Sequence, residues 1–375
     1  MNTAPIFDES LLGISTSKLN IAYWPTVMQT FEAKNYREAV LATLRYIDGS
    51  IFDKHSNPDQ SEFVIPHGSI RLTITLKDNM FFVSAPFVRV PATGGLPLLR
   101  QVADINFNIL VLTQIVMKND ELWFEYKCPI ELCDPYKLYD IFREICNNAD
   151  YYDDMFIEKF GAQRMVEVQA TQWAEGDVEK GWQKYQEYLK EATDYLAYFE
   201  SKRFFGFCWD TLAMTFMKID YYCGTQGYIR TEIEKGIFDL GAQAQLPDLI
   251  AKAKLVLEKL KTFDRAKFAS CMYKPNVFIS SKTRSDIAAI QNNLRTFYDR
   301  AKNEMGSADH IGATLSLMYG IFNLYFRNEI PAEITKILNE GLKNASQKEW
   351  KLASEALWKA ANTVMEMTNP TVSNQ

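Results

Sequence analysis

The sequence has few of the side chains that usually build metal or catalytic sites. It contains only three histidines, His55, His67 and His310, and none stands at ligand spacing from a cysteine or a carboxylate. The phosphate-loop run GxxxxGK[ST], the GxSxG motif and the local cysteine-protease signatures are also missing. We therefore expect no metal, no cofactor and no catalytic residue, with the histidines as surface or capping groups.

A basic run and a long apolar run are missing too. The formal charge is −6 and the pI about 5.4, and no Lys/Arg-rich segment offers the positive field that nucleic-acid binding needs. The most apolar segment, residues 311–326, is shorter than the roughly 20 residues that cross a bilayer. The start, MNTAPIFDESLLGIS, is interrupted by Asp8 and Glu9 and does not resemble a secretory signal. We expect a cytoplasmic protein with a buried helix at 311–326, no membrane span and no nucleic-acid partner.

The cysteines are scattered and lack the dense framework of small secreted proteins. This usage indicates reduced thiols. The segment CPIELC could bring Cys128 and Cys133 together at a strand end, but a tetrahedral site needs two further ligands. The six cysteines are Cys128, Cys133, Cys146, Cys208, Cys223 and Cys271.

The first part of the chain alternates helical and strand patterns. Apolar spacing predicts a helix over 25–48, then a hairpin turning at Asp78-Asn79, a short helix over LPLLRQVADINFN, a second hairpin turning at Asn119-Asp120, and one or two helices over 135–161. The loop DKHSNPDQS separates the first helix from the first hairpin. Residues 1–162 are thus predicted to form an α+β domain with an antiparallel four-stranded sheet in the order α-β-β-α-β-β-α.

The two hairpin registers predict what lies on the second face of that sheet. They place Phe82 beside Thr75 and Val116 opposite Trp123, among charged residues. Phe82, Val116 and Trp123 are our candidate protein-binding residues, because a tryptophan buries much area with little loss of entropy. Two alternatives stay open: the helical domain folds back onto this face, or Trp123 lies flat on its neighbours.

The rest of the chain is predicted to be helical. Residues 163–368 should form an all-α bundle or irregular solenoid, with a longer loop or irregular insert at 271–286 and a disordered tail at 369–375. The predicted helices span 177–201, 203–223, 228–243, 247–262, 285–305, 308–328, 331–344 and 347–367. Aromatic residues of the first helices either line a groove between helices or pack in the core: Trp182, Tyr185, Tyr188, Tyr195, Tyr198 and Phe199.

An acidic cluster lies before the boundary between the two parts. It comprises Asp150, Asp153, Asp154 and Glu158, and it lacks the alternating ligands and the glycine of a calcium loop. We expect these carboxylates to form a solvated helix face.

Residues 25–160 resemble the type III secretion chaperone-like fold, in particular its YbjN-like branch. The similar segments are LPLLRQVADINFN, where a leucine-rich helix ends near Asn106 or Asn108, and NNADYYDD, which contains Ala149-Asp150. Members of that group act mainly as secretion chaperones or regulators, so the resemblance implies protein binding without catalysis. The helical part resembles no family that we recognise.

The leading hypothesis is a non-catalytic protein-binding adaptor or chaperone-like module with an unidentified protein partner. The alternatives are a structural subunit of a larger assembly and an enzyme that lacks recognisable motifs. Self-association into a homo-oligomer also stays open.

Overall fold

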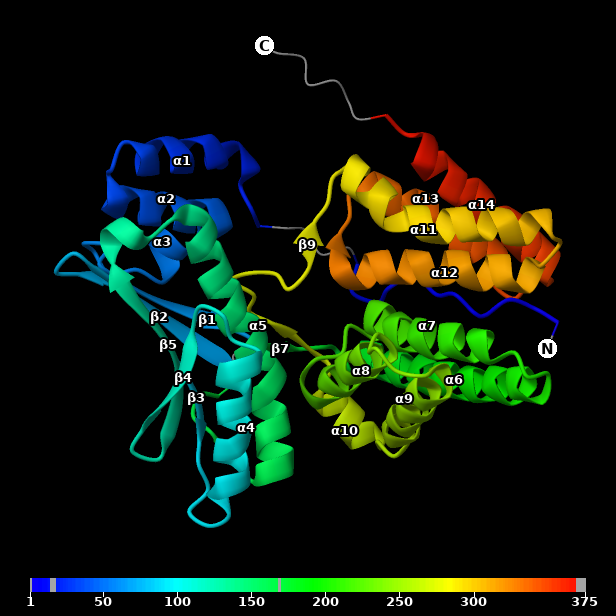
Figure 1. The fold of residues 1–375 in the computed structure, drawn as a ribbon, viewed down its shortest axis with the longest axis horizontal. Helices are drawn as coiled ribbons and strands as arrows, with labels where there is room; N and C mark the ends of the chain where they lie inside the picture. The colour runs from blue at the N-terminus through cyan, green and yellow to red at the C-terminus, as the bar shows by residue number, and fades with distance from the viewer. Residues whose placement is uncertain (1, 14–17, 168–169, 369–375) are drawn as a thin grey trace. The chain divides into compact units, whose positions relative to one another are not determined.

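The chain forms two compact units, and neither is a single continuous stretch of sequence. The computed structural model describes residues 2–13, 18–167 and 170–368. The α+β unit comprises Ser17–Gln172 and Tyr273–Ser281, and the helical unit comprises Met1–Thr16, Trp173–Met272 and Lys282–Gln375 (Figure 1). These bounds differ from the predicted division at 162/163: the division lies at 172/173, the first residues join the helical unit, and a short internal segment joins the α+β unit. The predicted tail, 369–375, lies outside the described residues.

The helices of the α+β unit follow the predicted pattern with one break. The expected single helix over 25–48 is wrong, because Lys34 adopts a left-handed φ of 58° and ends the first helix. Asp134 caps α5 by accepting from the amides of Tyr136 and Lys137. The helices are α1 (Trp24–Glu32), α2 (Tyr36–Asp48), α3 (Ile51–Lys54), α4 (Gly95–Asn108) and α5 (Pro135–Phe160), with 3-10 turns η1 (Ile21–Tyr23) and η2 (Ile130–Leu132).

The antiparallel sheet has six strands, so the predicted four were incomplete. Its order is β1-β2-β3-β5-β4, and β6 pairs with β3. The strands are β1 (Glu62–His67), β2 (Ile70–Lys77), β3 (Met80–Arg89), β4 (Gln114–Lys118), β5 (Glu121–Pro129) and β6 (Gln163–Arg164). The missed strands carry weak signals, since β1 contains Pro66, which is typical of an edge strand, and β6 spans only two residues.

Both predicted hairpin registers are confirmed. Leu76 pairs with Phe81 across the first turn. Lys118 pairs with Glu121 across the second. Asp78 adopts a φ of 53°, which a short polar side chain tolerates in a tight turn. The apolar positions therefore share one face, which forms a core with residues of α2, α4 and α5.

The segment Tyr273–Ser281, here called the crossing segment, is part of the α+β core. Its strand β8 (Tyr273–Pro275) pairs with β7 (Ala170–Gln172). The amide of Phe278 donates to Nδ1 of His67 at 3.1 Å, and the Phe278 ring lies 5.5 Å from that of Phe142. Phe278 and Ile279 are 3% and 2% exposed. Of the two expectations for the histidines, surface or capping group, the first is wrong for His67: it is 6% exposed under this segment, and its ring accepts from a main-chain amide.

The helical unit contains all eight predicted helices and the short α10. They are α6 (Glu175–Ser201), α7 (Phe205–Cys223), α8 (Gly227–Leu240), α9 (Leu246–Lys261), α10 (Arg265–Ser270), α11 (Ile287–Gly306), α12 (His310–Arg327), α13 (Ala332–Ala345) and α14 (Trp350–Glu366). β9 (Thr283–Arg284) and β10 (Asn328–Glu329) form a short parallel pair. Figure 1 shows α6–α9 grouped together and α11–α14 grouped together, and α7 packs on α12 between the groups. α12 is the buried helix expected at 311–326. Among the described residues, no helix combines the length and apolar character needed to span a bilayer.

Candidate protein-binding surfaces

The second face of the sheet, here called the outer face, carries the three predicted site residues. The core packs against the opposite face, and the alternation of the strands leaves Phe82, Val116 and Trp123 half-buried. Arg71 and Lys77 of β2 are exposed on the same face. The outer face is therefore a mixed surface of rings, aliphatic groups and charges.

Trp123 and Val116 form one cluster on this face. They are direct cross-strand partners, and Pro86 of β3 lies on the other side of Trp123. The indole Nε1 of Trp123 donates to Oε2 of Glu121 at 3.3 Å, and Nζ of Lys118 lies 4.9 Å from the ring centroid. Trp123 lies among charges as predicted, and its polar edge and its ring both have partners within the sheet.

Phe82 lies apart from that cluster. Its cross-strand partners are Thr75 and Lys127, whereas Trp123 faces Pro86. Phe82 and Pro86 are four residues apart on one strand, which corresponds to about 13 Å. The predicted trio is thus one pair plus a separate ring.

The β4 edge of the sheet is partly closed by side chains. The Nδ2 of Asn106 donates to the carbonyl of Ile115 at 2.9 Å, and its Oδ1 accepts from the amide of Ile115 at 2.7 Å. Just before the strand, the Glu144 carboxylate accepts from the amides of Val111 and Thr113. Closing an edge in this way protects it from pairing with other strands. Asn106, one of the two asparagines that the family resemblance left open, is a structural cap on this edge.

The acidic cluster is the expected solvated helix face only at Glu158, which is exposed; Asp153 is buried, and Asp150 and Asp154 are half-buried. Asp153 is 2% exposed, and Arg164 contacts both Asp153 and Asp154. The Asp150 carboxylate accepts from the amide of Ser69 at 3.2 Å, which ties α5 to the turn between β1 and β2. Burial, together with the neighbouring Asp154 and Asp150, raises the pKa of Asp153 to about 8. These carboxylates serve internal packing, and among the described residues no group of three His, Cys, Asp or Glu is arranged to hold a metal ion.

The Cys128 and Cys133 thiols do lie together, as the sequence suggested. Their Sγ atoms are 3.5 Å apart, and both cysteines are free and buried. Burial, reinforced by the adjacent Cys128, raises the pKa of the Cys133 thiol. A thiol with a raised pKa is a poor nucleophile, so this pair is suited to packing.

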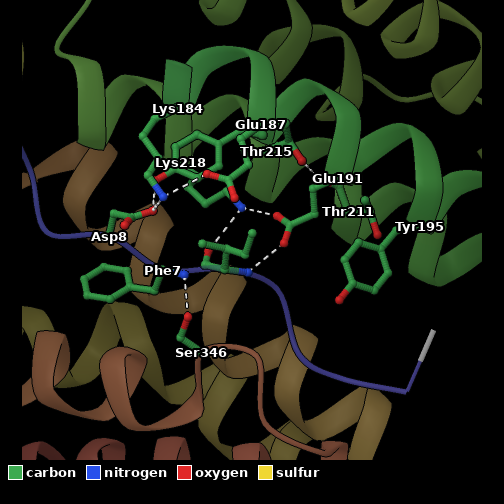
Figure 2. Close-up of polar contacts among 12 residues, drawn as sticks. Phe7, Asp8, Lys184, Glu187, Glu191, Tyr195, Thr211, Thr215, Lys218 and Ser346 are labelled. Atoms are coloured by element: carbon green, nitrogen blue, oxygen red, sulfur yellow. Dashed lines mark hydrogen bonds and ion pairs between the residues drawn. The ribbon is translucent and has the colours of Figure 1, made fainter. Parts of the chain in front are cut away.

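The helical unit holds a second surface, around an N-terminal segment that the sequence did not assign. Residues 2–13, here called the arm, run in extended form beside α6 and α7 (Figure 2). The Tyr195 hydroxyl donates to the carbonyl of Thr3 at 2.6 Å, and the amide of Ala4 donates to the carbonyl of Lys348 at 2.7 Å. The amide of Phe7 donates to the Ser346 hydroxyl at 2.9 Å. These contacts come from α6 and from the turn between α13 and α14.

A buried ion pair lies at the middle of the arm. Lys218 of α7 contacts Glu191 of α6, and their side chains are 1% and 11% exposed. Glu191 accepts from the amide of Ile6 at 2.7 Å, and Lys218 donates to the carbonyl of Ile6 at 3.2 Å. The two charges together bind both main-chain groups of one residue.

Asp8 makes the polar side-chain contacts of the arm. Its carboxylate lies 2.9 Å from Nζ of Lys184 and accepts from the Tyr188 hydroxyl at 2.9 Å. Burial, together with the adjacent carboxylate, raises the pKa of the Tyr188 phenol, which therefore stays a donor. Lys184, Tyr188, Glu191 and Tyr195 follow one another at helical spacing along a single stripe of α6.

Only part of the aromatic set singled out in the sequence faces the arm. Tyr188 and Tyr195 bind it, whereas Trp182 and Tyr185 pack against Phe268. Lys184 and Glu191 were missed, although the polar residues of this stripe repeat at intervals of four and three residues along the helix. That spacing could have indicated a polar stripe on the helix, but it does not identify the arm as the segment that binds there.

The comparisons with known proteins add no assignment. No family model matches the chain, and no curated protein matches it.

Proposed function

We propose that this protein is a non-catalytic adaptor or chaperone-like module that binds another protein through the outer face of its sheet. The observation that carries the proposal is the pair formed by Trp123 and Val116, half-buried among charged residues on the face opposite the core. Interfaces commonly combine a large ring at their centre with a polar rim. The resemblance of residues 25–160 to a group of chaperones and regulators favours the same class.

The charges around the pair determine what kind of partner fits. Lys118 and Glu121 hold the indole in one position, so a partner would meet a ring that is already oriented. Preorganisation of this kind lowers the entropy cost of binding. The mixed charge of the rim favours a protein surface that also carries both signs.

The test is a double substitution, Trp123→Ser with Phe82→Ser, in the full chain. We expect a protein that co-purifies with the wild type from native lysate to be lost, with the melting temperature lowered by no more than a few degrees. The matched control is Phe107→Ser, which removes a ring that is 88% exposed on α4 and lies off the outer face. The control should keep the partner.

A large fall in melting temperature in the double variant would show that the outer face is an internal packing surface. Equal recovery of the partner by wild type and double variant would also reject the proposal. Several subunits recovered together at fixed stoichiometry would favour the structural-subunit alternative.

A further inference from the structure

The groove that holds the arm binds polypeptide backbone. Glu191 and Lys218 bind the amide and the carbonyl of Ile6, and Ser346 binds the amide of Phe7. Every extended segment offers such groups whatever its sequence. Sites that recognise peptides by strand addition obtain affinity in the same way, from main-chain hydrogen bonds, and specificity from side-chain pockets.

The ion pair in the groove is compatible with exchange of its occupant. Burying Lys218 and Glu191 is costly unless their remaining hydrogen-bonding capacity is used, and Ile6 uses part of it. Lys218 also lies 4.2 Å from the centroid of the Tyr188 ring. Water could take the place of the Ile6 amide and carbonyl, because both charged groups bind water readily. At the position of Ile6, water can therefore replace the occupant, whereas Ala4 and Phe7 on either side are buried in the apolar core of the helical unit.

Two neighbouring side chains of the arm supply specificity. Phe7 is 7% exposed, and its ring lies 6.0 Å from Tyr221 in a stacked arrangement and 6.4 Å from Phe322. Asp8 follows directly and meets the cation of Lys184 at 2.9 Å. The groove thus holds an aromatic residue followed by an acidic one (Figure 2).

We propose that this groove is an exchangeable binding site for an extended segment of a partner protein, with an aromatic residue followed directly by an acidic one. The arm, which carries Phe7 and Asp8, is the occupant that competes with that segment. Two observations favour such a partner segment: the cation of Lys184 complements an acidic side chain, and the contacts at Ile6 bind the main chain of any extended segment. The inference goes beyond the function proposed above, because the groove lies in the helical unit and uses no residue of the outer face.

The test measures binding of a labelled peptide, NTAPIFDESLLG, which reproduces residues 2–13, to the full chain by fluorescence anisotropy. The key variant is Phe7→Ser with Asp8→Lys, which weakens the chain's own arm and leaves the groove residues unchanged. We expect this variant to bind the peptide at least about tenfold tighter than the wild type, whose tethered arm competes at high effective concentration. A peptide with the Phe-Asp order reversed should bind at least about tenfold more weakly.

A charge exchange provides the matched control. Adding Lys184→Glu to a chain with Phe7→Ser and Asp8→Ala, whose own arm then has no charge at position 8, should weaken binding of the wild-type peptide and favour a peptide with lysine in place of Asp8. If the double variant does not fold, Asp8→Lys alone takes its place, with an expected gain of at least about threefold over the wild type.

Three results would overturn the proposal. Absence of peptide binding to every folded variant would make the arm a fixed part of the helical unit. Equal binding of the reversed peptide would remove the specificity. Dimers of the wild type that form at high concentration and dissociate on addition of the peptide would assign the groove to the arm of a second copy. None of these measurements depends on Trp123 or Phe82, so the groove and the outer face can fail independently.

Discussion

The arm and the crossing segment are both short pieces of chain held by a unit built mainly from another part of the sequence, but they are held by different forces. The crossing segment contributes Phe278 and Ile279 to the apolar core of the α+β unit. The arm is bound through main-chain groups by Glu191 and Lys218, and through Asp8 by Lys184. The arm also places Ala4 and Phe7 in the apolar core of the helical unit, so what distinguishes it is the charged side chains that bind its main chain and Asp8.

The difference indicates which segment can leave. Removing a buried ring opens a cavity that the surrounding core cannot fill, so the crossing segment is a permanent component of its unit. Hydrogen bonds to a main chain can be replaced by hydrogen bonds to water at modest cost. The arm does bury one ring deeply, that of Phe7, and so the strength of this anchor decides how replaceable the arm is.

The largest effect is expected from Phe278→Ala. The side chain is 3% exposed and packs on Phe142, so its truncation should lower the free energy of unfolding of the α+β unit by about 4 kcal/mol. Urea unfolding followed by far-UV circular dichroism, with hydrogen exchange of the β1 amides, measures this loss.

Phe7→Ala is the matched truncation in the arm. Because the arm can leave the groove, the loss is capped by the free energy of docking the arm, and we expect about 1–2 kcal/mol. The comparison between the two segments would fail if Phe7→Ala cost as much as Phe278→Ala, since the arm would then be as permanent a part of its unit as the crossing segment.

An intermediate effect is expected from Lys218→Met. This change leaves the Glu191 carboxylate without its counter-ion and the Ile6 carbonyl without its donor, and it should cost about 3 kcal/mol in the helical unit. Lys118→Met is the control, because that side chain is 49% exposed on the outer face and its pairing with Glu125 is worth less than about 1 kcal/mol. Thermal unfolding of both variants measures the difference.

Equal losses for Lys218→Met and Lys118→Met would contradict the distinction between the two surfaces. The double variant Lys218→Met with Glu191→Met sharpens the result. It should recover part of the stability, because replacing both buried charges by apolar groups removes the unpaired carboxylate.

The sequence predicted what depends on neighbours along the chain. Both hairpin registers and the eight long helices of the helical unit were predicted, because alternation, helical spacing and turn residues are local signals. The contact of Asn106 with Ile115 was not predicted, although it spans only nine positions. The missed strands β1 and β6 are short or contain proline, so the same signals are weak there.

The arm and the crossing segment could not be predicted, because their partners are distant in sequence. Glu191 and Lys218 lie 185 and 212 positions from Ile6, and Phe278 lies 211 positions from His67. Patterns along a helix show that a polar stripe exists, but they do not identify the segment that occupies it. The pair formed by Trp123 and Val116 was predicted because a hairpin is local, whereas the position of Phe82 relative to that pair depends on how β3 pairs with β5.

An effect that depends on pH concerns a buried charge of the helical unit, Asp210 of α7, which pairs with another helix of that unit. It is 2% exposed and lies 3.3 Å from Arg300. Burial raises the pKa of Asp210 to about 6 against the opposing effect of Arg300. Since the folded-state pKa lies above the unfolded value near 4, the contribution of Asp210 to stability is present below about pH 4 and is lost as the pH rises through about 6. In the variant Asp210→Asn the side chain cannot ionise, so the variant does not show this loss of stability as the pH rises. Between pH 4.5 and 7.5, the stability of the variant relative to the wild type should therefore rise by about 2 kcal/mol, as measured by urea unfolding at both pH values.

Peptide binding to the groove of the Phe7→Ser, Asp8→Lys chain should not change when Asp210→Asn is added, because the pair formed by Asp210 and Arg300 contributes no contact to the arm among those described above. A stability difference that is the same at both pH values would contradict the raised pKa, and a change in peptide binding would show that the arm groove is coupled to the general stability of the helices.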